Sequence, residues 1–149
     1  MSISNSFSIS SSALTAQRLR MDIVSSNIAN AETTRAKVAN GEAVPYRRKM
    51  VVMSPNTPSF GDTLNSALGN TSTGQGVKVT QIKEDSAPFK PVYNPTHPDA
   101  DSEGYVYMPN VDILKEMVDM ISATRSYEAN VTALNASKAM ITKALQIGK

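Results

Sequence analysis

Apolar residues recur at helical spacing at both ends of the chain, and the first such stretch runs from about residue 7 to residue 33. Its positions form two heptad rows, of which polar residues interrupt the second: Phe7, Leu14, Met21 and Ile28, then Ser10, Gln17, Val24 and Ala31. This spacing predicts an amphipathic helix about 40 Å long with a narrow apolar seam. The pattern continues into SSNIANAETT (25–34) without a Gly or Pro stop, so we expect the helix to end near Thr33.

A longer helix is predicted from PNVD (109–112) to Gly148. Asn110 is a suitable N-cap, and Asp112 and Glu116 would lie near the positive end of the helix dipole. The apolar positions follow steps of three and four residues: Ile113, Met117, Met120, Thr124, Tyr127, Val131, Leu134, Ile141 and Leu145. A second apolar row lies beside the first turns: Leu114, Val118 and Ile121. Two adjacent rows indicate that this helix, about 55 Å long, meets more than one neighbour.

The middle of the chain has the composition of strands and turns. It holds all eight prolines except Pro109 and all seven glycines except Gly148. Three short runs are β-like: Tyr46–Met53, Val77–Ile82 and Tyr105–Met108. The predicted fold class is α+β, with long N- and C-terminal helices forming a coiled-coil-like pair and a small β-rich insert with long loops between them. The corresponding domains are an N-terminal axial helix, the insert and a C-terminal axial helix: 1–34, 35–108 and 109–149.

Two helices of this length cannot be covered by a sheet of about twenty residues, so we expect them to pack on each other and on other chains. The net charge of +2 is too small to direct the whole chain to nucleic acid or to a membrane. Residues 17–49 are mainly basic and residues 99–128 mainly acidic, so these stretches can pair within a chain or between neighbours. We expect neither a cleavable signal peptide nor a membrane-spanning segment.

No residues form a recognisable catalytic or metal-binding set. Cysteine is absent, which excludes disulfides, thiolate catalysis and Cys-type zinc sites. The single histidine, His97, lies among turn prolines without a nucleophile at a defined spacing. The run 99–104 resembles the start of an EF-hand loop, but Asn110 stands where the bidentate Glu is required. Residues 47–49 (RRK) are expected to form the solvated edge of a strand. We therefore expect no catalytic residue, metal or cofactor, and binding or assembly remains.

Specific motifs carry more information than these patterns. SALTAQRLRMDIVSSNIANAETT (12–34) resembles the N-terminal signature of flagellar rod and hook proteins, a helix that ends in S-x-N-I/L-A-N-A/V. The stretch 108–147 is similar to the matching C-terminal signature. Three features are most similar to proximal-rod members of the family: the short insert, PYRRKMVVM (45–53) and VYNPTHPDADSEGYVYMPNVD (92–112). The resemblance implies a structural subunit of the bacterial flagellum basal body, in the periplasmic rod. Such subunits are exported by the flagellar type III apparatus and polymerise into a helical tube that transmits torque.

The resemblance also implies a set of partners: other copies of the chain, the proximal-rod proteins FlgB and FlgF, the distal-rod protein FlgG, the FliE adaptor with the MS ring, and the flagellar export apparatus. Within one subunit we expect two sets of residues to pack together: Leu14, Met21, Val24 and Ile28 against Met120, Tyr127, Val131 and Leu134. The row Leu114, Val118 and Ile121 would face a neighbour. Asn27 and Asn30 would offer donors and acceptors to neighbouring backbone and fix the register of the helices.

Two other classes of function remain open at this point. A soluble coiled-coil adaptor or export chaperone would bind a single partner through one helical seam and form a stable dimer. An enzyme would have to use the loop HPDADSEG (97–104), which lacks a paired acid and base.

Overall fold

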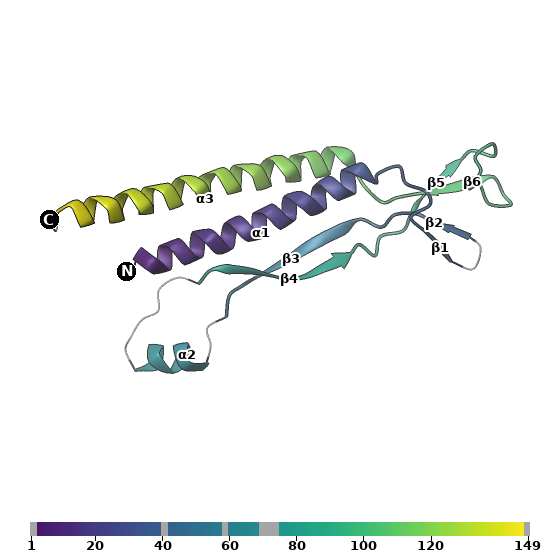
Figure 1. Ribbon diagram of the computed structural model, residues 1–149. Helices are drawn as coiled ribbons and strands as arrows, with labels where there is room; N and C mark the ends of the chain where they lie inside the picture. The colour runs from purple at the N-terminus through teal and green to yellow at the C-terminus, as the bar shows by residue number, and fades with distance from the viewer. Residues whose placement is uncertain (1–2, 40–41, 58–59, 69–74, 148–149) are drawn as a thin grey trace. The chain divides into compact units, whose positions relative to one another are not determined.

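The fold, obtained as a computed structural model that describes residues 3–39, 42–57, 60–68 and 75–147, is α+β (Figure 1). Two long helices lie at the ends of the chain, α1 (Ile3–Ala29) and α3 (Ile113–Ile147), and a short helix α2 (Phe60–Ala67) lies between them. The predicted fold class, with two long terminal helices and a small β-rich part between, is confirmed.

The strands pair two by two in the part of the chain that the structure describes. They are β1 (Lys37–Ala39), β2 (Glu42–Val44), β3 (Lys49–Pro55), β4 (Val77–Glu84), β5 (Lys90–Tyr93) and β6 (Tyr105–Met108). The antiparallel pair β1–β2 sets Lys37 opposite Val44, and the antiparallel pair β5–β6 sets Tyr93 opposite Tyr105. The three predicted β-like runs are confirmed as β3, β4 and β6, whereas β1, β2, β5 and α2 were not predicted.

The chain divides into two compact units. The first contains Met1–Leu19, Val52–Gln81 and Ala123–Lys149, and the second contains Arg20–Val51 and Ile82–Ser122. Each unit therefore contains part of α1, part of α3 and part of the stretch between them, so the units are distinct from the three regions expected from the sequence.

In the first unit the most buried side chains are small: Ser10, Ala16, Ala123 and Ser137. Small side chains let neighbouring backbones approach closely. Gly76 shows how close this approach is, because a Cβ at this position would lie 2.4 Å from Oγ of Ser12. That hydroxyl accepts a hydrogen bond from the Val77 amide (3.1 Å) and donates one to the Ile9 carbonyl (2.7 Å). Gly76 thus allows the start of β4 to be held directly on α1.

Helix α1 ends at Ala29, so the predicted end near Thr33 is wrong. The Ser26 carbonyl in the last turn accepts two hydrogen bonds from Asn30, the helical one from its amide N–H (3.1 Å) and a second from its side-chain Nδ2 (2.9 Å). Its Oδ1 accepts a bond from the Thr33 hydroxyl (3.2 Å), and its carbonyl accepts one from the Thr33 amide (3.2 Å). A side-chain amide therefore replaces the Gly or Pro stop.

Helix α3 begins at Ile113, and its N-cap is Asp112 rather than Asn110. Oδ1 of Asp112 accepts hydrogen bonds from the amides of Leu114 (3.0 Å) and Lys115 (3.4 Å). Asn110 instead accepts a bond from the Arg48 amide (3.2 Å). The predicted stop at Gly148 lies outside the described residues.

Candidate assembly site

A buried polar cluster joins α1, β3 and α3 in the second unit; it consists of Asn27, Tyr46, Arg48 and Glu116. Glu116 has no exposed surface. Its Oε1 accepts a hydrogen bond from Nε of Arg48 (2.6 Å) and lies 2.6 Å from a second guanidinium nitrogen. Its Oε2 accepts a bond from Nδ2 of Asn27 (2.9 Å). The two guanidinium contacts and the amide donor offset the free-energy cost of burying this carboxylate.

Asn27 uses its whole hydrogen-bonding capacity within the chain. Its Oδ1 accepts bonds from the Lys49 amide (2.9 Å) and the Tyr46 hydroxyl (3.0 Å). Its Nδ2 donates to the Lys49 carbonyl (2.8 Å) as well as to Glu116. The backbone that Asn27 meets is therefore strand β3 of its own chain. That Asn27 and Asn30 also contact a neighbouring copy stays a prediction.

Further ion pairs connect the basic and acidic stretches within the second unit. Arg20 pairs with Asp119 at 3.0 Å, and Arg48 lies 3.7 Å from Asp119. Arg48 also lies 3.6 Å from Asp85, which is outside the acidic stretch. Of the two predicted alternatives, pairing of the basic and acidic stretches within one chain is confirmed. The expectation that residues 47–49 form a solvated edge is wrong for Arg48, whose side chain is only 14% exposed.

The sheltered face of α3 differs from the predicted seam. Its buried and half-buried members keep steps of three and four residues: Glu116, Met120, Ala123, Tyr127, Asn130, Leu134 and Ser137. The ends of the predicted seam are exposed: Ile113, Met117, Ile141 and Leu145. On α1, the buried positions include Ser10 and Val24, which belong to the row that polar residues interrupt, whereas Phe7 is exposed. Apolar spacing alone did not predict these faces, because several of their most buried positions hold small or polar residues.

The residues expected to pack within one subunit are sheltered. Val24 is buried, and the other seven are half-buried: Leu14, Met21, Ile28, Met120, Tyr127, Val131 and Leu134. In contrast, the side chains of the second apolar row are 76, 66 and 59% exposed, in the order Leu114, Val118 and Ile121. We call these three residues the α3 row. It lies in the second unit and is the expected contact surface for a neighbour.

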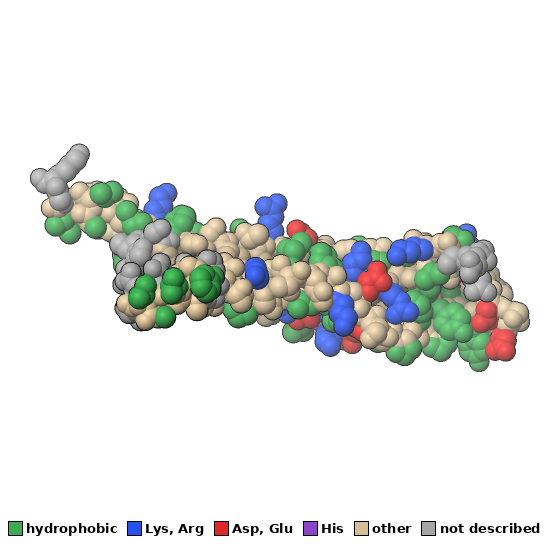
Figure 2. All heavy atoms as spheres, turned by 90° about the horizontal axis from the view of Figure 1, so that it is seen from below, with side chains coloured by type: hydrophobic (Ala, Val, Ile, Leu, Met, Phe, Trp, Pro, Cys, Tyr) green, Lys and Arg blue, Asp and Glu red, His purple; other side chains and the backbone are tan. Residues whose placement is uncertain are grey.

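Two other apolar surfaces are exposed. In the first unit, large side chains are exposed at intervals of four residues on α2 and directly after it: Phe60, Leu64 and Leu68. Figure 2 shows hydrophobic side chains on one face of the molecule. In the second unit, Tyr93, Tyr105 and Tyr107 are exposed on the β5–β6 pair, and the first two rings meet edge to face with centroids 5.4 Å apart. Exposed apolar groups on separate elements are typical of a chain with several protein neighbours.

The loop between β5 and β6 is tied to the segment after α1. Asp99 accepts hydrogen bonds from the Thr34 hydroxyl (2.9 Å) and from Nε of Arg35 (3.0 Å), and a second guanidinium nitrogen of Arg35 also contacts it. The Thr34 hydrogen bond, followed by the Arg35 guanidinium, lowers the pKa of Asp99 below its ordinary value. His97 Nδ1 accepts a bond from the Asp99 amide (3.1 Å), so the histidine belongs to the turn.

Acidification should loosen this connection. Because the folded pKa of Asp99 is lower than the unfolded one, its stabilising contribution is present above about pH 4 and is lost as the pH falls through the folded pKa. We expect the NMR signals of the Thr34 hydroxyl and the Arg35 Nε–H to shift at pH values below 4, whereas in Asp99→Asn this pH-dependent shift is absent. Identical titration curves for the two proteins would contradict the assignment.

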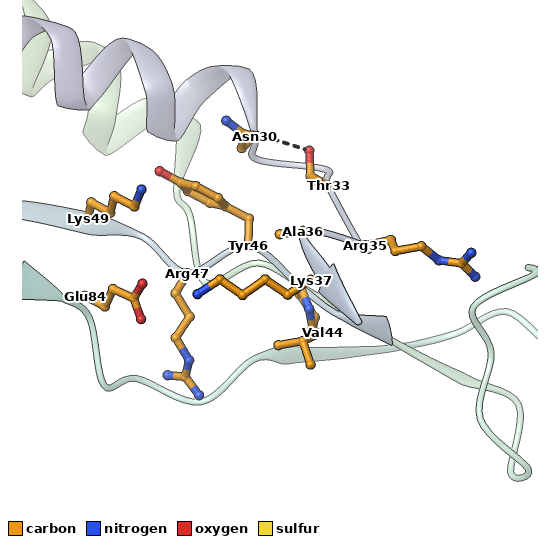
Figure 3. Close-up of a pocket in the computed structure, with 11 residues that line it drawn as sticks. Asn30, Thr33, Arg35, Ala36, Lys37, Val44, Tyr46, Arg47, Lys49 and Glu84 are labelled. Atoms are coloured by element: carbon orange, nitrogen blue, oxygen red, sulfur yellow. Dashed lines mark hydrogen bonds between the residues drawn. The ribbon is translucent and has the colours of Figure 1, made fainter. Parts of the chain in front are cut away.

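A basic cavity of about 540 Å³ lies beside this connection, in the second unit (Figure 3). Its lining comes from the end of α1, from the β1–β2 pair and from the facing ends of β3 and β4. Lys37 and Glu84 extend toward its centre, whereas the guanidinium of Arg35 points away from it (Figure 3). Arg47 and Lys49 complete the charged lining, and Arg47 also lies 4.5 Å over the ring of Phe89.

The described residues show no group of three or more His, Asp or Glu placed to hold a metal ion. Oδ1 of Asp101, in the segment that resembles an EF-hand start, accepts bonds from the amides of Glu103 and Tyr105, both at 2.9 Å, and so shapes the turn. No helix in the described part of the chain is both long enough and apolar enough to cross a membrane.

The ion pair between Arg48 and Glu116 was not predicted from the sequence. Glu116 was assigned to the helix dipole, although it lies four residues before Met120 and seven before Ala123, on the sheltered face. A carboxylate in register with a buried row is a signal for a buried pair, but it does not show which cation completes it.

Two family models match the ends of the chain. One, described as flagella basal body rod protein, matches residues 7–37, and another, described as flagellar basal body rod FlgEFG protein C-terminal, matches residues 102–147. These matches contain most of α1, the start of β1, β6 and α3. The two matches identify the chain as a rod protein of the bacterial flagellar basal body, and the two long terminal helices lie largely within the matched residues.

Comparison with whole proteins narrows this class. The chain is 61% identical to the flagellar basal-body rod protein FlgC of Bacillus subtilis (strain 168), with all of both chains covered. It is 46% identical to FlgC of Borreliella burgdorferi, covering 99% of this chain and 98% of the relative, and 45% identical to FlgC of Escherichia coli O6:H1 over the full length of both. The chain belongs to the FlgC family of flagellar basal-body rod proteins. It is a structural subunit located in the basal-body rod.

Proposed function

We propose that this subunit belongs to the proximal part of the rod, where it polymerises with its own copies and with other rod proteins into a helical tube. The observation that carries the proposal is the α3 row, whose three large apolar side chains are more than half exposed in the isolated chain. Covering each of them would stabilise the assembly by about 1.5–3 kcal/mol at most. Repeated along a tube, such contacts distribute torque over many subunits.

The neighbours proposed for the tube are FlgB and FlgF in the proximal rod, FlgG in the distal rod, and FliE with the MS ring at the base. The subunit would reach them through the flagellar type III export apparatus, which takes unfolded chains. The exposed apolar groups on α2, α3 and the β5–β6 pair support several different neighbours rather than one. This also argues against a soluble coiled-coil adaptor or export chaperone, for which one helical seam would suffice.

Sedimentation velocity separates the two proposals. We expect the purified chain to sediment as a monomer at low micromolar concentration and to form larger species when FlgB or FlgF is added. An unrelated protein of similar mass is the control and should leave the sedimentation unchanged. A stable dimer of the chain alone, unaffected by either rod protein, would favour the adaptor.

A further inference from the structure

The basic cavity carries more positive charge than the chain itself compensates. Its lining contains one carboxylate, Glu84, and three cationic side chains without a carboxylate partner among the described residues: Lys37, Arg47 and Lys49. Within the described part of the chain, the ion pairs of arginine and lysine residues with carboxylates involve Arg20, Arg35, Arg48 and Arg125, and so none of these three cations. The cavity therefore has a net charge of about +2 and fits an acidic group from outside the chain.

A complementary group projects from the same unit, at the turn between β5 and β6. Asp101 and Glu103 are both exposed, and neither forms an ion pair with a described residue. The turn is held in shape by the hydrogen bonds to Oδ1 of Asp101 and by Gly104, whose φ of 82° is readily adopted only by glycine. Its two carboxylates are therefore presented on a preorganised turn, which lowers the entropic cost of binding.

The turn of one chain is separated from the cavity of that chain by the β1–β2 pair. Val44 lines the basic cavity, whereas its neighbour Ala43 lines a second hollow together with Asp99 and Asp101. Successive residues of a strand point to opposite faces, so β2 stands between the two. Arg35 reaches the turn side and is already paired with Asp99. Hence the exposed carboxylates of the turn are available to another molecule.

We propose that the basic cavity of one subunit binds the Asp101–Glu103 turn of a second copy. Lys37, Arg47 and Lys49 pair with the two carboxylates, with Lys37 and Lys49 as the most adaptable donors. The contact joins different surfaces of identical chains, and such head-to-tail contacts generate rings or open helices. The inference rests on the proposed function, because it requires copies of the subunit to be neighbours in the rod.

The test uses charge reversal in cells whose own copy of the gene is deleted, with rods counted in isolated basal bodies. The cavity variant carries Lys37→Glu and Lys49→Glu. The turn variant carries Glu103→Lys with Asp101→Asn, since asparagine keeps the oxygen that accepts the turn bonds. A swap variant carries all four changes. Lys83→Glu, an exposed reversal on β4 outside the cavity lining, is the matched control, and urea unfolding of each purified chain checks its fold.

We expect the cavity and turn variants each to lower the number of completed rods about fivefold or more, because like charges then face each other. The swap variant should recover at least half of the wild-type number, and Lys83→Glu should leave it unchanged. Normal rod numbers in either single variant, or no recovery in the swap, would overturn the inference. A loss confined to the cavity variant would also overturn it, by indicating another acidic partner.

The same strains distinguish this inference from the proposed function. If the charge variants build normal rods while disruption of the α3 row abolishes them, the subunit polymerises in the rod without this contact. If the wild-type chain itself fails to restore rods, the proposed function fails.

Discussion

Replacing Arg48 by methionine should lower the free energy of unfolding by about 3–5 kcal/mol, because it leaves the Glu116 carboxylate buried without its cation. Methionine keeps much of the length and apolar surface of the arginine stem, so the effect reports the lost charge rather than a cavity. Domains of this size are typically stable by about 5–15 kcal/mol, so the variant would approach the limit of folding.

Urea unfolding followed by circular dichroism measures this effect. Arg125→Met is the matched control, since it removes the exposed Arg125–Glu128 pair on α3 and should cost about 0.5 kcal/mol or less. Adding Glu116→Leu to Arg48→Met should restore more than half of the loss, because no charge then remains buried without a partner. A double variant as unstable as the single one would show that the cluster stabilises by shape rather than by charge pairing.

Ile121→Asp should abolish rod assembly and swimming while leaving the isolated chain folded. The side chain is 59% exposed, so aspartate remains hydrated in the monomer and should change the free energy of unfolding by only about 0.5 kcal/mol. Between subunits the same carboxylate would be buried without a cation, a cost that recurs at every copy.

Swimming-ring diameter on soft agar and recovery of rods in basal-body preparations provide the measurements. Ala133→Asp introduces the same charge at an exposed position of α3 that lies twelve residues, or about 18 Å, along the helix from Ile121, and should leave both unchanged. Normal swimming with Ile121→Asp would remove the α3 row from the set of assembly contacts. Loss of swimming together with an unfolded monomer would mean that Ile121 stabilises the chain itself.

Periodicity predicted the long elements of this fold because each depends on residues close together in sequence. The heptad spacing indicated α1 and α3, and the runs that became β3, β4 and β6 follow strand composition. The end of α1 was wrong because Asn30 ends the helix through its side chain, which apolar spacing does not register. The short elements β1, β2, β5 and α2 were missed because none of them shows a clear periodic pattern.

The candidate site was only partly predictable. The exposed α3 row followed from the second apolar row, and Asn27 was recognised as a residue that meets backbone. Its actual partner, the backbone of Lys49, is 22 residues away, and Glu116 is 89 residues away. Contacts at such separations depend on how the chain folds back on itself, and residue spacing in a single sequence does not predict them. The basic cavity likewise arises only when β1, β3 and β4 are brought together.

The polar cluster also sets an order for maturation of the chain. Asn27 and Arg48 are made early, whereas the carboxylate that completes their hydrogen bonds arrives only with residue 116, after 89 and 68 residues respectively. A chain that stops before α3 lacks the carboxylate that pairs with Arg48 inside the cluster, so we expect its second unit to be less stable than that of the whole chain.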